Sequence, residues 1–99
     1  MKMRTTLAAL LALSAMGTAQ AQDANLGRNL AATCANCHGT NGHAIAGADS
    51  LAGESAEKIV RTVMEFRSGD KPATIMHQIS KGYTEEQIKL IADYFAAQK

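Results

Sequence analysis

The sequence is poor in the large side chains from which a small protein builds its core. It has no tryptophan, two tyrosines and two phenylalanines in 99 residues. A chain of this size is marginally stable unless a disulfide, a metal or a cofactor adds to its hydrophobic core. We therefore expect one small domain that depends on such a group.

The sequence also lacks a hydrophobic run long enough to cross a membrane as a helix, which takes about 20 residues. Its longest apolar run covers residues 7–16, follows two basic residues and precedes an Ala-Gln-Ala cleavage site. That order is typical of a secretory signal peptide. We predict that residues 1–21 are a cleaved signal peptide, and that residues 22–99 form a periplasmic domain without a membrane span.

Neither sign of charge is in excess. Residues 22–99 contain eight Lys and Arg and nine Asp and Glu, which are interspersed along the chain. A nucleic-acid-binding surface requires a cluster of basic residues. The charge pattern therefore excludes nucleic acid as a predicted partner.

The chain has only two cysteines, in the pentapeptide Cys34-Ala35-Asn36-Cys37-His38. A disulfide between them would close almost no loop, a thioredoxin-type pair requires a preceding strand, and a zinc site completed by two histidines would leave the chain without a core. C-x-x-C-H is the signature of covalent haem attachment, in which two thiols add to the vinyl groups of one porphyrin. We predict one haem c on Cys34 and Cys37. His38 is then the proximal iron ligand, and its other ring nitrogen donates to a backbone carbonyl.

Four side chains are candidates for the distal iron ligand: Met64, Met76, His43 and His77. Met64 lies on the apolar face of a predicted helix, which favours core packing. His43 follows the proximal histidine too closely to reach the opposite haem face. Met76 lies in an irregular segment that can close over that face, so we predict that it is the ligand. His77 is the alternative if Met76 only packs against its apolar neighbours.

Hydrophobic periodicity predicts three main helices and no strand. They cover residues 25–33, about 55–68, and a final segment that begins at Thr84 with Gln87 completing a capping box. Gly27 lies inside the first helix, where it costs about 1 kcal/mol relative to alanine. We expect another element to approach the backbone closely at Gly27.

The stretches between these helices carry turn residues. Residues 38–53 are rich in glycine, with asparagine, aspartate and serine, and are predicted to be loop and turn. Residues 73–83 are a short connection with room for one helical turn.

These features resemble the class I cytochromes c, through Gly27 and Leu30 in the first helix, the C-A-N-C-H motif, a distal methionine, and Tyr94 in the last helix. The resemblance implies a small all-α fold of three main helices around one covalent haem. It also implies that Gly27 lets the first and last helices cross closely, with Tyr94 against it.

A narrower resemblance involves the segments CANCHGTNG, MEFRSGDKPATIMHQISKGYT and IADYFAAQK. They are similar to the cytochrome subunit of flavocytochrome c sulfide dehydrogenase. The resemblance implies that the methionine of T-I-M, here Met76, is the distal ligand. It also implies a flavoprotein partner that oxidises sulfide and passes electrons to the haem. His77 stands where many class I cytochromes have a proline.

The predicted function is electron transfer by a non-catalytic cytochrome subunit, which accepts electrons from the flavoprotein and passes them to a downstream acceptor. This function needs no general acid, general base or activated nucleophile. Two alternatives are open at this stage. One is a free soluble carrier of a respiratory chain, and the other is a haem-based ligand sensor or weak peroxidase whose distal position opens.

Overall fold

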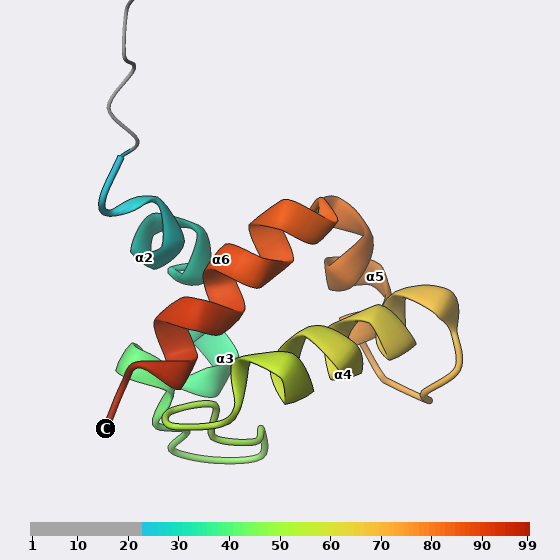
Figure 1. Ribbon diagram of the computed structural model, residues 1–99. Coiled ribbons are helices and arrows are strands. Elements are labelled where there is room, and N and C mark those ends of the chain that lie inside the picture. Colours follow the sequence, from blue (N-terminus) through green and yellow to red (C-terminus); the bar gives the residue numbers. More distant parts are fainter. Residues whose placement is uncertain (1–22) are drawn as a thin grey trace, which may run out of the picture.

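The computed structural model describes residues 23–99, and the predicted signal peptide lies outside them. The chain folds into helices and turns, with no strand among the described residues (Figure 1). The elements in chain order are α2 (Leu26–Ala31), α3 (Ala35–His38), η1 (Thr40–Gly42), α4 (Ala56–Ser68), α5 (Met76–Ile79), η2 (Ser80–Gly82) and α6 (Glu85–Ala96). The predicted all-α fold with three main helices is confirmed. None of the described helices is long and apolar enough to cross a membrane.

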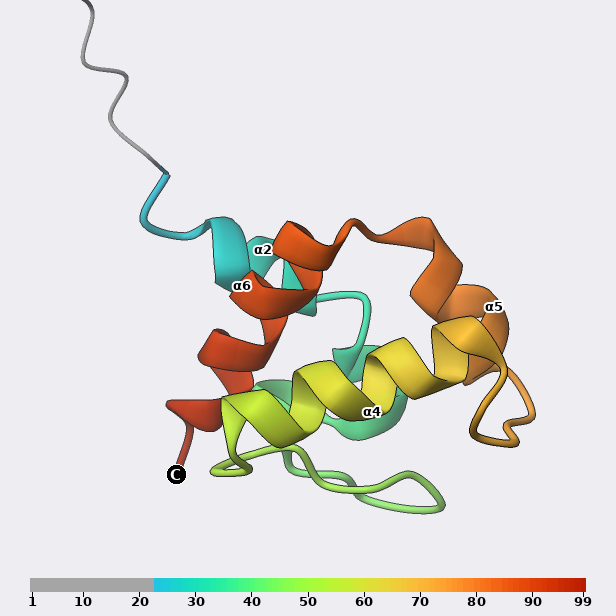
Figure 2. The same cartoon turned by 45° about the vertical axis from the view of Figure 1, so that its right-hand side comes forward.

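The first helix packs across the last one, as Figures 1 and 2 show for α2 and α6. A Cβ atom added at Gly27 would lie 2.9 Å from the backbone oxygen of Leu90 and 3.7 Å from Cβ of Tyr94. The first distance is shorter than real Cβ contacts allow. Glycine at this position therefore permits the close crossing, as expected from the sequence.

The helix ends follow local hydrogen bonds. Ser55 begins α4 by accepting a 3.1 Å bond from the backbone N–H of Lys58, and Thr84 begins α6 with a complete capping box to Gln87. The first helix is shorter than the predicted 25–33. The Oγ1 of Thr33 donates to the backbone oxygen of Leu30, and such a side-chain bond competes with continuation of a helix.

Within residues 23–99, the buried hydrophobic cluster is small and joins the three main helices. Its members are Ala31, Ile59, Ile91, Ala92 and Phe95. Burial of about five such side chains is little for a domain of this size. The core therefore matches the expectation of a fold that depends on a further group.

Two irregular segments lie at opposite ends of α4 (Figures 1 and 2). The loop over residues 39–53 leads into the start of α4. The segment 69–83 leaves its end at Gly69, which adopts the left-handed conformation (φ 86°), and carries α5 and η2 before α6 begins. The cleft described below lies between Cys34, which precedes the first of these segments, and Met76 in the second.

Candidate haem site

The C-x-x-C-H motif forms a single helical turn. The backbone N–H of His38 donates a 2.9 Å bond to the carbonyl of Cys34, and that of Cys37 donates a 3.3 Å bond to the same carbonyl. Residues three and four apart lie on the same side of a helix. The two thiols and the imidazole therefore project from one side of α3 and the residue before it, which is the arrangement that attachment to one flat cofactor requires.

A narrow cleft with mainly apolar walls lies beside this turn. Cys34 lines it together with Met76, Ile79 and Tyr83 from the segment 69–83, and its other walls are apolar side chains of α4 and α6, with Ser80. The cleft brings together a thiol from the first part of the chain and a thioether from the second. Apolar walls suit the faces of a porphyrin, and thiol and thioether sulfur suit its attachment and its iron, whereas the space between the walls, about 30 Å³, is far smaller than a porphyrin.

His38 is oriented by the loop that follows it. Its Nδ1 lies 2.6 Å from the backbone oxygen of Asp49. A carbonyl oxygen only accepts, so Nδ1 carries the proton and donates. Nε2 is then the unprotonated nitrogen with a lone pair for a metal ion. The expected hydrogen bond to a backbone carbonyl is confirmed, and the donor set fits a haem iron.

The two cysteines differ in environment, and both are free thiols in the structure. Cys37 is exposed, whereas Cys34 is half-buried against the cleft. Burial raises the pKa of the Cys34 thiol, and a hydrogen bond with the side chain of Thr33 opposes this shift. At neutral pH, before any attachment, Cys34 is therefore a neutral thiol.

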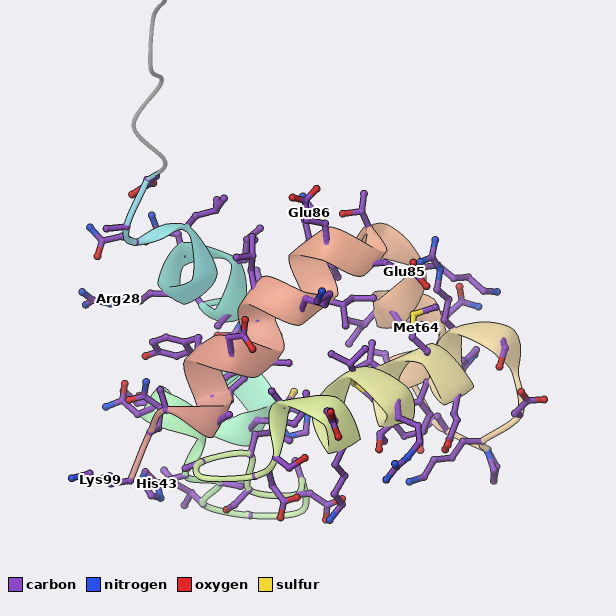
Figure 3. The ribbon with its side chains drawn as sticks, viewed as in Figure 1. Arg28, His43, Met64, Glu85, Glu86 and Lys99 are labelled. Carbon is purple, nitrogen blue, oxygen red and sulfur yellow. The ribbon has the colours of Figure 1, made fainter. Side chains whose placement is uncertain are left out.

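The other candidate distal ligands lie outside the lining of the cleft. Met64 is partly buried on α4, and His43 lies at the other end of the molecule beside Lys99 (Figure 3). His43 is an exposed loop residue, and its Nε2 is 2.6 Å from the backbone oxygen of Lys99. His77 is partly buried, and its Nδ1 has no hydrogen-bond partner among the described residues.

The alternative zinc site is not assembled. Across residues 23–99, no three side chains of His, Cys, Asp or Glu lie close enough together to hold a metal ion. The two cysteines and two histidines that such a site would need are therefore separated in the structure.

One pair beside the cleft was not found from the sequence. The hydroxyl groups of Tyr83 and Thr33 lie 2.5 Å apart, although the residues are 50 positions apart in the chain. Tyr83 belongs to the K-G-Y-T pattern, but no local pattern relates that segment to the residue before Cys34. Only the folded chain brings them together.

Comparison with known proteins identifies the family. No family model matches the chain. Over 83 residues the chain is 32% identical to cytochrome c-554(548) of Halomonas halodenitrificans, a match that covers 80% of this chain and 100% of that protein. The chain belongs to the class I cytochromes c. It is accordingly a c-type cytochrome with one covalently bound haem c.

Two further relatives of this cytochrome are larger. It is 42% identical over 69 residues to the cytochrome subunit of sulfide dehydrogenase of Chlorobaculum tepidum, with 70% of this chain and 63% of that protein covered. A solved structure of Acidithiobacillus ferrooxidans cytochrome c4 matches it with a TM-score of 0.66 at 26% identity, over 83% of this chain and 54% of that one. The cytochrome thus spans little more than half the length of these two proteins.

Proposed function

We propose that this cytochrome accepts electrons from a flavin-containing sulfide dehydrogenase subunit. The observation that carries the proposal is the 42% identity to the cytochrome subunit of sulfide dehydrogenase, and the flavin follows from the family resemblance described above. In this assignment sulfide is oxidised on the partner, and the cytochrome receives single electrons and passes them to a downstream acceptor. The cytochrome itself needs no catalytic residue.

The residues assigned to the haem are Cys34 and Cys37 for the two thioether bonds, His38 as proximal ligand and Met76 as distal ligand. Support comes from the protonated Nδ1 of His38, which leaves Nε2 for iron, and from the cleft that Cys34 and Met76 share. When bound, the haem iron cycles between the ferric and ferrous states. The protein residues would hold it through the two thiols and would supply a nitrogen and a sulfur donor for its iron.

The proposed location is the periplasm. Residues 1–21 have the basic, apolar and small-residue order of a signal peptide. Cleavage after Ala21 would leave residues 22–99 as the mature domain. N-terminal sequencing of the protein isolated from its own cells tests this, with Gln22 expected as the first residue.

A second candidate function is that of a free electron carrier. The observation that favours it is the match to cytochrome c-554(548), which this chain covers over its whole length. The ligand-sensor or peroxidase alternative requires an open distal position. The presence of Met76 in the same cleft as Cys34 is the observation that argues for a closed one.

The deciding experiment begins with the native cytochrome purified from its own cells under mild conditions. We expect a flavoprotein to copurify, and we expect the complex to reduce its haem rapidly with sulfide as the only electron donor. The control is the cytochrome alone with the same sulfide concentration, which measures direct reduction. Absence of a flavoprotein, with haem reduction no faster than in the control, would favour the free carrier.

A further inference from the structure

The segment 69–83 forms the side of the cleft that carries Met76, and it is joined to the opposite side by a single polar contact. Within residues 23–99, the bond between Tyr83 and Thr33 is the one hydrogen bond that links this segment to residues 23–53. Thr33 directly precedes Cys34, and Tyr83 itself lines the cleft. The contact therefore spans the cleft beside the point of haem attachment.

Thr33 takes part in more than one hydrogen bond at this point. Its hydroxyl lies 3.3 Å from the backbone oxygen of Leu30, which can only accept, and 2.5 Å from the hydroxyl of Tyr83. Either hydroxyl can donate in the bond between Thr33 and Tyr83. When Thr33 donates to Leu30, Tyr83 donates to Thr33, and the two bonds link Tyr83 to the end of α2.

The chain between Met76 and Tyr83 is short and locally ordered. It consists of α5 and η2, with the Ser80 side chain buried and bonded to the backbone oxygen of His77 at 3.3 Å. Two consecutive helical turns therefore connect Met76 to Tyr83.

We propose that Tyr83 is a positioning residue for the distal iron ligand. Its hydrogen bond to Thr33 holds the segment 76–83 against the side of the cleft that carries Cys34, and so sets how readily an external ligand replaces the Met76 sulfur. This inference rests on the proposed haem site.

The structure offers conservative variants and a matched control. Tyr83→Phe removes the hydroxyl and keeps the ring in the cleft, and Thr33→Val removes the acceptor at nearly constant volume. The control is Tyr94→Phe, because Tyr94 also makes a long-range phenol bond, at 2.8 Å to Oδ1 of Asn41, but away from the distal segment. If imidazole binding only reported a general loss of stability, its affinity would rise in both tyrosine variants. If Tyr83 positions the ligand, the affinity should rise only in Tyr83→Phe.

The test is an imidazole titration of the oxidised holoprotein, followed by loss of the thioether-to-iron absorption band at the red end of the spectrum. We expect Tyr83→Phe and Thr33→Val each to raise the apparent imidazole affinity by about three- to tenfold, the effect of losing one net hydrogen bond. The double variant should show no more than Thr33→Val alone, since Thr33→Val already removes the bond to Tyr83. The imidazole affinity of Tyr94→Phe should stay within about twofold of that of the wild type, because the bond that this variant loses does not involve the distal segment.

Two results would overturn the proposal. One is an unchanged imidazole affinity in Tyr83→Phe, and the other is an equal rise in Tyr94→Phe. Both leave the proposed function intact, provided that the wild type shows the thioether band and covalent haem. A wild type with covalent haem but no such band would instead overturn the Met76 assignment together with this inference. Absence of covalent haem would overturn the haem site itself.

Discussion

The two sides of the cleft are built differently. The side that carries the C-x-x-C-H motif is fixed by hydrogen bonds between distant parts of the chain. The backbone oxygen of Gly42 accepts from Leu51 and Ala52, at 2.8 and 3.2 Å, and the backbone N–H of Gly53 donates a 3.0 Å bond to Phe95. The side that carries Met76 has the Tyr83 bond and apolar contacts, with Ile75 and Ile79 exposed.

This difference indicates which side of the cleft is held in place without a cofactor. The attachment side is held by backbone groups that need no cofactor. The distal side depends on side-chain packing around a cleft that the cofactor would share. Under the proposed assignment, covalent bonds to one side and the Met76 sulfur from the other would let the haem complete the side that has fewer hydrogen bonds.

The largest effect is expected when haem attachment is prevented, because this tests whether the fold depends on the cofactor. The double variant Cys34→Ala and Cys37→Ala should lose cooperative thermal unfolding, because the buried cluster is too small to stabilise a domain of this size. Circular dichroism melting against the holoprotein measures this. Acid-acetone extraction should leave the colour with the wild-type polypeptide. A colourless variant that melts cooperatively, or a wild type whose colour is extracted, would contradict the prediction.

The next largest effect is expected at Met76. Met76→Ala should abolish the thioether-to-iron band and open the iron to added ligands. Met64→Ala should keep the band and lower the free energy of unfolding by roughly 1–2 kcal/mol, since Met64 is only partly buried. Absorption spectra and denaturant melts of both variants, with His77→Ala as a third, assign the ligand. If Met64→Ala or His77→Ala loses the band and Met76→Ala retains it, the assignment is wrong.

A smaller effect on the free energy of unfolding is expected from alanine substitutions of two glycines, Gly27 and Gly82. Gly27→Ala places a Cβ atom 2.9 Å from a backbone oxygen, whereas a Cβ atom at Gly82 meets nothing within 4 Å. Overpacking should outweigh the gain in helix propensity at Gly27, for a net loss of about 1–2 kcal/mol. Gly82→Ala should leave the free energy of unfolding unchanged or slightly raised. Equal stability of the two variants in urea would show that the helix crossing is not tight.

The smallest predicted effect is at the junction of the distal segment and α6. Thr84→Ala removes the acceptor of the 3.1 Å bond from the backbone N–H of Gln87, at a cost of about 1 kcal/mol. Thr84→Ser keeps this acceptor and should melt close to the wild type. A melting temperature of Thr84→Ser as low as that of Thr84→Ala would contradict the capping explanation.

The elements that the sequence predicted are those with local causes. Apolar periodicity located α4 and α6, and the capping box at Thr84 located the start of α6. An unfavourable glycine in a helix indicated the close crossing at Gly27. The motif also indicated that His38 needs a carbonyl partner. That partner, Asp49, lies in a loop without periodicity, so only the folded structure could name it.

The contacts across the cleft could not be predicted for the same reason. Thr33 and Tyr83 are each ordinary in their own segments, and their bond depends on how α2 and α6 cross. Local signals fix where helices begin and end. They do not determine which side chains of distant segments meet.

The bond between His38 and Asp49 also bears on the reduction potential. A ring that donates its Nδ1 proton to a carbonyl becomes a stronger electron donor through Nε2. With His38 as the proposed proximal ligand, this bond would favour the ferric state, whose positive charge is greater. The energy at which the cytochrome takes up an electron would then be set in part by a backbone oxygen in the loop 39–53.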